Sequence, residues 1–457
     1  MKRIKNHPLI IGTAILTITG FLSRIIGFFY RIYLSRAFGE EGMGIYQLVN
    51  PVLSLSFSLT AAGYQTAISK FVAERSALEK HPSLRPLLAG FSISLPLSLL
   101  CGFVVLRFAD FIATDLLMEE RTASMLRILA FSIPLSAVHS CINGYFYGCK
   151  KTGVPAATQL IEQITRVACV YALCTYAFGE GKKPSINVAV YGLTAGELVS
   201  MFVSILAAYA CYAANLRTVS PKQILPQRSR SLGPVYASIL GMALPLTANR
   251  IVLNVLQSIE SVSIPARLRL YGYDNTTALS VYGVLTGMAM PFIFFPNALT
   301  NSVSVLLLPM ISESCALGDM DAVKKASLRT IKYCFLLGMT CMGIFFLFGG
   351  WAGTVIFNSP LAGYFIRTLG FLCPFLYLDT TLSSILQGLG MAGHIFVMNL
   401  ICLSLRLAFV FFAIPRFGIS GYLWGILLSQ IILGILYLLC LRRFLNKTAA
   451  LHTAPKK

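Results

Sequence analysis

Charged side chains are scarce in this sequence. Only 12% of the 457 residues are Asp, Glu, Lys or Arg, whereas 56% are hydrophobic. A soluble protein of this length needs far more polar surface to cover its core. The composition therefore excludes an ordinary soluble domain and indicates a chain that lies largely within a lipid bilayer.

Sequence patterns for metal, disulfide or nucleotide chemistry are also lacking. Most of the twelve cysteines lie in apolar stretches, and no two of them form a Cys-x-x-Cys pair. The five histidines show no ligand spacing, and the chain has no Walker motif and no inserted soluble catalytic domain. For His139, which lies well inside an apolar stretch, a hydrogen-bonded structural role is favoured over a proton relay. We therefore expect no metal, no cofactor and no enzymatic activity.

Long apolar runs recur along the whole chain. Each contains about twenty residues, enough for a helix to cross roughly 30 Å of hydrocarbon. Because no water is present there, the backbone must satisfy its own hydrogen bonds, so the runs should be helices. We predict an all-α integral membrane protein with about twelve transmembrane helices, at 9–30, 44–68, 86–107, 124–147, 154–178, 187–214, 235–261, 279–308, 330–350, 364–387, 394–414 and 420–441.

The two halves of the chain repeat each other. The segment from Arg127 to Pro134 returns between Arg367 and Pro374, a shift of 240 positions (from 127 to 367), and the same shift places Arg166 on Arg406. A shift of 229 positions relates three later pairs, Gly192 with Gly421, Gly196 with Gly425 and Ser200 with Ser429. Six spans fall in each copy, so both copies have the same orientation. Two parallel six-helix repeats are typical of a transporter whose halves move against each other.

The net charge of +20 would suit nucleic acid, but the basic residues are concentrated in alternate loops. The predicted cytoplasmic segments hold roughly twice as many Lys and Arg as the outer loops, which predicts that both termini are cytoplasmic. The basic segments then face anionic lipid head groups, and no nucleic-acid motif accompanies them. We predict an N-terminal bundle at 1–216, a basic cytoplasmic linker at 217–233, a C-terminal bundle at 234–445 and a cytoplasmic tail at 446–457.

Polar stripes run along the first two predicted helices of each half. Arg24 and Arg31 are seven residues apart on the first helix and therefore share one face. The seventh helix shows Arg250, Asn254 and Gln257 at spacings of three and four. A polar stripe in a membrane helix faces partner helices or water. We predict that the stripes line a hydrated cavity between the halves, with Arg24, Arg31, Arg250, Asn50, Asn254, Gln257, Asn297 and Asn301 as substrate-binding residues.

Acidic residues inside the predicted spans are few. A charged side chain in the membrane is energetically costly, so we expect each acid to be paired or functional. Glu162 and Arg166 are one turn apart, which favours a structural ion pair. Glu197 and Glu260 are the candidates for binding a coupling ion, and Glu260 is also a candidate to neutralise Arg250.

Two further basic residues have alternative readings. Arg406 has no acid at the spacing seen for Arg166, and Asp379 is its candidate partner. Arg36, near the outer end of the first span, is expected to extend its charged end to the interface, as Arg31 would if it takes no part in the cavity.

The start of the chain shows a familiar pattern. Leu22-Ser-Arg-Ile-Ile-Gly-Phe-Phe-Tyr-Arg-Ile-Tyr-Leu-Ser-Arg-Ala-Phe-Gly39, followed by Glu41-Gly-Met-Gly-Ile-Tyr46, resembles the opening of the stage V sporulation protein B group. This group belongs to the polysaccharide-flippase branch of the multidrug/oligosaccharidyl-lipid/polysaccharide (MOP) exporter superfamily, which also includes the MATE exporters and the lipid II flippases. The resemblance extends over essentially the whole chain.

The resemblance implies a V-shaped pair of six-helix bundles around a central cavity. The implied cargo is an undecaprenyl-pyrophosphate-linked sugar, such as a lipid II-type precursor of peptidoglycan or spore cortex, moved across the bacterial cell membrane. Arg24 matches a cavity arginine of the lipid II flippases, whereas Arg31 lies one residue later than their second arginine. Those flippases usually carry two additional C-terminal helices, and the last span predicted here ends near Leu441. Membrane lipids and cell-wall synthesis proteins are the implied partners.

Elementary chemistry agrees with this cargo. A pyrophosphate carries about two negative charges, and the planar fork of arginine binds phosphate oxygens well. Membrane potential, or Na⁺ or H⁺ coupling, is then the expected energy source. The alternatives are a cation-coupled multidrug exporter of the same fold, a membrane-embedded glycosyltransferase and a scaffold for a synthetic complex. The glycosyltransferase would use an acidic outer segment that contains Asp110, Asp115, Glu119 and Glu120.

Overall fold

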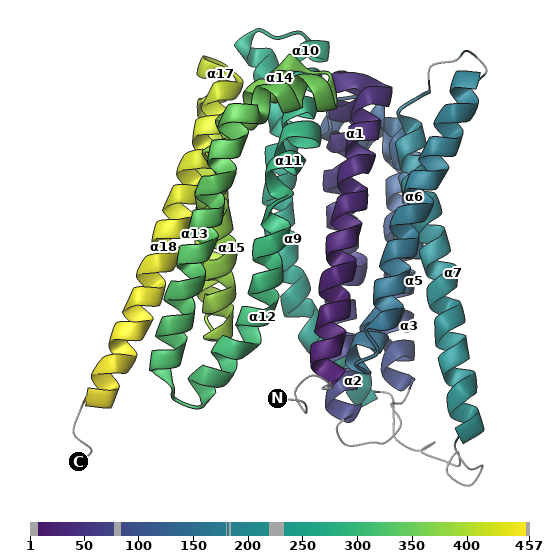
Figure 1. The fold of residues 1–457 in the computed structure, drawn as a ribbon. Helices are drawn as coiled ribbons and strands as arrows, with labels where there is room; N and C mark the ends of the chain where they lie inside the picture. Colours follow the sequence, from purple (N-terminus) through teal and green to yellow (C-terminus); the bar gives the residue numbers. More distant parts are fainter. Residues whose placement is uncertain (1–7, 77–83, 180, 182–183, 219–232, 454–457) are drawn as a thin grey trace. The chain divides into compact units, whose positions relative to one another are not determined.

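The protein is almost entirely helical. The computed structural model describes residues 8–76, 84–179, 181, 184–218 and 233–453, and no strand occurs in these ranges (Figure 1). The predicted linker at 217–233 lies mostly outside them. The last helix continues to Thr453, past the bundle boundary predicted at 445.

The described elements of the first half are long helices, a short helix and two π-helical turns. They are α1 (Pro8–Phe57), η1 (Ser58–Ala62), α2 (Gly63–Ser76), α3 (Arg85–Arg107), α4 (Ala109–Phe111), η2 (Ile112–Leu116), α5 (Thr122–Gly148), α6 (Gly153–Gly179) and α7 (Asn187–Thr218). Gly39 interrupts α1 with a positive φ of 71°, a conformation that glycine adopts without a Cβ penalty. The first two predicted spans are therefore joined by a kink rather than by a loop.

The second half follows the same plan with more breaks. Its elements are α9 (Gly233–Tyr271), α10 (Asn275–Gly283), η3 (Val284–Ala289), α11 (Met290–Phe294), α12 (Asn297–Ala316), α13 (Met320–Trp351), η4 (Ala352–Ile356), α14 (Pro360–Gly370), α15 (Cys373–Gly388), α16 (Ala392–Phe412), α17 (Ile414–Phe417) and α18 (Ile419–Thr453). α14 and α15 meet at a bend of 57°.

All twelve predicted spans fall on helical segments. Among the described residues, the number of helices that are long and apolar enough to cross a membrane is smaller than twelve. Ten helices in the described ranges are long and apolar enough to cross a membrane, or eleven if the bent pair is included. One of the ten is a run of 61 residues, Ala14–Glu74, which contains the Gly39 kink and is long enough for two crossings. α6 is not among the ten, and it carries Glu162, Gln163 and Arg166.

Contacts divide the chain into two compact units. Unit 1 contains 1–30 and 48–258, and unit 2 contains 31–47 and 259–457. Both units are therefore discontinuous in sequence. The kinked segment 31–47, from the first half, packs within unit 2, and α9 contributes its first part to unit 1 and its last part to unit 2. The division into two six-helix bundles at the linker stays a prediction.

Equivalent glycines bring equivalent helices together in the two units. A Cβ on Gly148 would lie 2.6 Å from the Ser69 carbonyl oxygen, where α5 packs against α2. Its repeat counterpart Gly388 has the same role, since a Cβ there would lie 2.9 Å from the Leu308 carbonyl oxygen, where α15 packs against α12. Apolar cores surround both contacts. The sequence repeat is thus also a repeat of packing.

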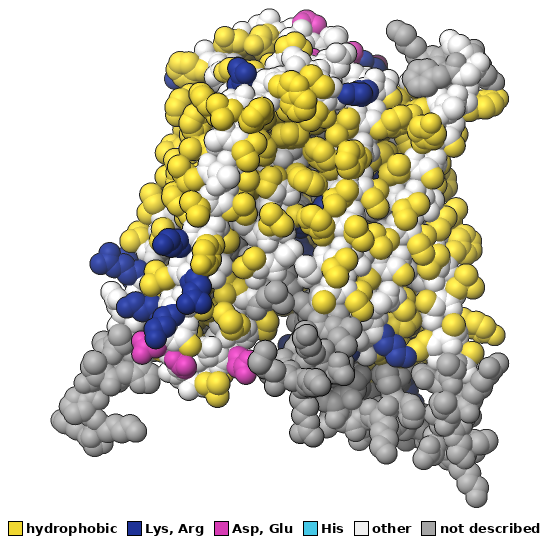
Figure 2. Space-filling view, viewed as in Figure 1, with side chains coloured by type: hydrophobic (Ala, Val, Ile, Leu, Met, Phe, Trp, Pro, Cys, Tyr) yellow, Lys and Arg dark blue, Asp and Glu magenta, His cyan; other side chains and the backbone are white. Residues whose placement is uncertain are grey.

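The surface separates apolar and basic regions. Hydrophobic side chains cover most of the middle of the body, whereas Lys and Arg gather over the lower ends of α13 and α18 in this view (Figure 2). The exposed basic residues of these two helix ends are Lys324, Lys325, Arg329, Lys332, Arg442 and Arg443. All twelve cysteines are free, and seven of them are buried, as expected for apolar filler.

Candidate functional site

Two of the predicted arginines lie on the surface of unit 1. Arg24 on α1 and Arg250 on α9 both have exposed side chains. Neither forms an ion pair or a hydrogen bond with any residue that the structure describes. Each is therefore a basic group on an apolar membrane helix with its donors available for an anion.

The polar stripes of the second and seventh helices meet within unit 1. Asn254 of α9 donates through Nδ2 to the Ser58 hydroxyl at 2.5 Å and to the Ser54 carbonyl at 3.4 Å. The helices approach closely because residue 63 is glycine, where a Cβ would lie 2.0 Å from the Thr247 hydroxyl. Asn254 thus holds α9 against η1 with Arg250 one turn away on the same helix.

The remaining predicted asparagines and glutamine differ in their surroundings. Gln257 is exposed and Asn50 is partly buried, both in unit 1. Asn297 and Asn301 lie on α12 in unit 2 and are partly buried. The Asn297 carbonyl oxygen accepts hydrogen bonds from Thr300 and, at 3.3 Å, from Thr380. The structure therefore gives Asn297 a role in joining α12 to α15.

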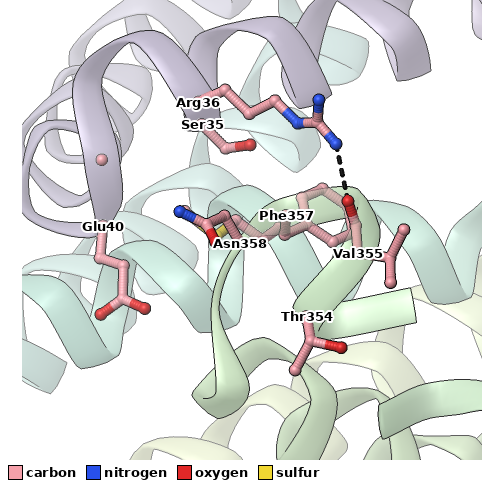
Figure 3. A pocket seen from close by; sticks show the side chains of 9 residues that line it. Ser35, Arg36, Glu40, Thr354, Val355, Phe357 and Asn358 are labelled. Atoms are coloured by element: carbon pink, nitrogen blue, oxygen red, sulfur yellow. Dashed lines mark hydrogen bonds between the residues drawn. The ribbon is translucent and has the colours of Figure 1, made fainter. Parts of the chain in front are cut away.

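The outer end of the first span is held within unit 2. Arg36 donates through Nη2 to the Val355 carbonyl at 2.6 Å (Figure 3) and through Nε to the Ile356 carbonyl at 2.9 Å. These carbonyls end η4 and would otherwise lack partners. The Arg36 side chain is exposed, and the extension of its charge to the interface stays a prediction. Arg31 is partly buried in the same segment.

A pocket of about 440 Å³ opens beside these contacts. It lies within unit 2, and its lining residues are Ser35, Arg36, Gly39, Glu40, Met288, Thr354, Val355, Phe357 and Asn358 (Figure 3). Next to it, the Ser359 hydroxyl donates to the Glu40 carboxylate at 2.5 Å and also caps α14. None of the predicted substrate-binding residues lines this pocket. Its polar groups instead fasten the kinked segment 31–47 to the loop after η4.

Four ionisable side chains form a mostly buried cluster in unit 1. His139 of α5 lies 2.7 Å from Glu197 of α7, measured from Nε2 to the carboxylate oxygen. Arg166 lies 2.6 Å from Glu162, one turn earlier on α6. The structure thus brings the predicted Glu162–Arg166 pair together, and it adds His139 and Glu197 beside that pair.

A second buried ion pair occurs in unit 2 with different partners. Arg406 of α16 binds Glu260 of α9 through two hydrogen bonds, of 2.8 Å and 2.5 Å. The Tyr422 hydroxyl of α18 donates to the same carboxylate at 2.9 Å. Glu260 is therefore occupied by Arg406 and Tyr422. Its partner is Arg406 and not Arg250, and its role in binding a coupling ion stays a prediction.

The predicted partnership of Arg406 with Asp379 is wrong. Asp379 on α15 is only 5% exposed, and neither carboxylate oxygen has a hydrogen-bond partner among the described residues. Sequence reasoning missed Tyr422 and the Glu260–Arg406 pair, since 146 positions separate the two partners and no periodic spacing connects them.

Comparisons with known proteins agree with this architecture. The sequence model of the polysaccharide biosynthesis protein family matches residues 9–315. Stage V sporulation protein B of Bacillus subtilis (strain 168) is 30% identical over 430 residues, which are 93% of this chain and 82% of that protein.

Two solved structures share the fold at low sequence identity. An inward-facing multidrug resistance MATE family transporter of the MOP superfamily has a TM-score of 0.70 at 16% identity, covering 94% of this chain and 96% of that one. The lipid II flippase MurJ in an inward closed conformation also has a TM-score of 0.70, at 15% identity, covering 93% and 87%. The protein is a multi-pass membrane transporter, and the chain belongs to the polysaccharide biosynthesis protein family.

Proposed function

We propose that this transporter is a flippase that moves undecaprenyl-pyrophosphate-linked sugar precursors from the inner to the outer leaflet by alternating access. The observation that carries the proposal is the unequal pairing of charges. Each glutamate deep in a span has a basic partner: Glu162 with Arg166, Glu197 with His139 and Glu260 with Arg406. Arg24 and Arg250 have none among the described residues. The free charge on the membrane helices of unit 1 is therefore positive and suits an anionic cargo.

A lipid-linked pyrophosphate has the chemistry that these arginines would recognise. Its two phosphates accept paired hydrogen bonds from a guanidinium fork. The prenyl tail can stay in the lipid while only the head group crosses. An inside-negative potential favours outward movement of two negative charges by about 4.6 kcal/mol at 100 mV, so potential alone can bias export.

The relatives support this class of cargo without naming the sugar. One relative is a stage V sporulation protein, and a protein of the same fold is the lipid II flippase MurJ, which favours a precursor of peptidoglycan or spore cortex. The basic ends of α13 and α18 would face the cytoplasmic leaflet, with both termini inside, in the bacterial cell membrane.

The second candidate is a cation-coupled multidrug exporter, because a MATE transporter matches the fold as well as MurJ does. A cationic drug would be served better by an accessible unpaired carboxylate than by unpaired arginines. Asp379 is unpaired among the described residues, but it is only 5% exposed. The glycosyltransferase alternative has less support. Two acids of its proposed active segment are engaged in ion pairs, Glu119 with Arg121 at 2.5 Å and Asp110 with Arg127 at 2.7 Å.

The test is translocation of fluorescent lipid II by the purified protein in liposomes, with and without an inside-negative potential. We expect flipping that the potential stimulates and that falls by about tenfold or more in Arg24→Ala and in Arg250→Ala, since each loses a charge-assisted hydrogen bond of roughly 1.5–3 kcal/mol. Arg329→Ala, which removes an exposed arginine from α13, is the matched control and should flip at the wild-type rate. Wild-type protein that moves no lipid II but exports cationic dyes against a sodium or proton gradient would replace the flippase with the drug exporter.

A further inference from the structure

The core of unit 1 contains a cluster of charged residues that has no role in the transport of a lipid precursor as proposed above. A ring nitrogen of His139 and one carboxylate oxygen each of Glu162 and Glu197 lie within 4.8 Å of one another. The three residues come from three different helices, α5, α6 and α7. The closeness depends on Gly196, where a Cβ would lie 2.9 Å from the Glu162 carbonyl oxygen. A glycine beside Glu197 therefore lets α7 approach α6 until the two carboxylates are neighbours.

A chain of hydrogen bonds fixes the imidazole of His139. The Thr158 hydroxyl donates to the side-chain amide oxygen of Asn143, Oδ1, and Asn143 Nδ2 lies 3.4 Å from His139 Nδ1. When Asn143 donates to Nδ1, the imidazole proton lies on Nε2 and points to the Glu197 carboxylate 2.7 Å away. In this arrangement the imidazole is neutral.

The charges of the cluster do not balance with a neutral imidazole. The charged groups that face one another from α5, α6 and α7 are His139, Glu162, Arg166 and Glu197. Two carboxylates and one guanidinium leave one net negative charge inside a membrane helix bundle, where an uncompensated charge is expensive. One added proton makes the cluster neutral. A divalent metal ion would instead leave it with a net positive charge.

We propose that His139 and Glu197, with Glu162 and Arg166 beside them, form a single-proton site that couples proton movement to the transport cycle. The proton binds His139 at Nδ1 once the Asn143 amide turns its oxygen toward the ring, and the imidazolium then pairs with Glu197. Release of the proton restores the hydrogen-bond chain described above. This inference rests on the proposed transport function and adds the ion that drives it.

The first test sets a pH gradient across liposomes at zero membrane potential and follows fluorescent lipid II. If one proton moves with each lipid, one pH unit is worth about 1.4 kcal/mol and changes the steady-state ratio of lipid between the leaflets by up to tenfold. We expect this shift in the wild type and in His394→Asn, which replaces an exposed histidine at the start of α16. His139→Asn should abolish it, because the variant lacks the imidazole that takes up the proton. Glu197→Gln should also abolish it, because its cluster is neutral without a proton.

A second measurement needs no substrate. Hydrogen exchange of the full-length protein at pH 6 and pH 8, corrected for intrinsic exchange, should show a change in protection of α5, α6 and α7 that His139→Asn and Glu197→Gln remove and His394→Asn keeps. A pH response that survives in His139→Asn, or a wild type without one, overturns the site. If the wild type moves no lipid II but keeps the His139-dependent change in exchange, the proposed cargo fails and the proton site stands.

Discussion

The two halves of the repeat neutralise a buried arginine at equivalent positions in different ways. A shift of 240 places His139 on Asp379, Glu162 on Cys402 and Arg166 on Arg406, and the shift of 229 places Glu197 on Ile426. The first half surrounds its arginine with two glutamates and a histidine from neighbouring helices. The second half keeps the arginine but has lost both glutamates, and Arg406 receives its counter-charge from Glu260 on α9.

This comparison shows which part of the cluster the fold itself requires. The arginine is present in both halves, so the scaffold tolerates a buried guanidinium there, provided that a carboxylate reaches it. The source of that carboxylate is free to change. In the first half it lies on the same helix as the arginine, and in the second half it fastens α9 to α16. The acid–base chemistry around His139 is therefore an addition of the first half rather than a structural necessity.

The largest expected effect comes from breaking the pair of the second half. Glu260→Ala leaves Arg406 without a carboxylate, and we expect a destabilisation of about 3–5 kcal/mol because Glu260 is only 4% exposed. Thermal unfolding of the purified protein in detergent measures it. Glu162→Ala is the matched change in the first half. Its loss should be about 1–3 kcal/mol, because Glu162 and Arg166 keep 15% and 17% exposure on one helix turn. Equal losses would contradict the comparison.

The next effect tests the equivalence of packing. Gly148→Ala places a methyl group 2.6 Å from both the Ser69 carbonyl oxygen and the Val72 side chain, whereas in Gly388→Ala the shortest contact is 2.9 Å. Overpacking of this kind costs about 1–3 kcal/mol, and the tighter site should lie at the upper end. Melting temperatures of the two variants, with Gly393→Ala in open space as the control, give the order. A larger loss at Gly388 would show that the second half packs more rigidly than its distances indicate.

Much of the fold follows from the sequence because hydrocarbon leaves the backbone few choices. The prediction at 86–107 became α3, Arg85–Arg107, and the prediction at 187–214 became α7, Asn187–Thr218. The breaks did not follow. The kink at Gly39 and the bend between α14 and α15 lie in apolar stretches, and a mean hydropathy does not record where a helix changes direction.

The site residues divide along the same line. Glu162 and Arg166 were found because a spacing of four places two side chains on one face of a helix. Glu260 and Arg406 were missed because their contact depends on how α9 packs against α16, which neither segment encodes alone. His139 was read as structural for a similar reason, since its partner Glu197 lies 58 positions away.

The smallest expected effect concerns the acid that the second half leaves unpaired. Asp379 occupies the position of His139, and its carboxylate has no partner among the described residues. An unpaired buried carboxylate is destabilising when charged, so the isosteric change Asp379→Asn should leave the free energy of unfolding the same or raise it by about 1 kcal/mol. Thermal unfolding at neutral pH measures the change, with His139→Asn as the counterpart in the first half, where the loss of the bond to Glu197 should lower stability. If the two variants change the free energy of unfolding with opposite signs, this position of the repeat holds a paired group in the first half and an unpaired group in the second. A strong loss in Asp379→Asn would instead mean that the carboxylate binds a cation that holds α15 in place.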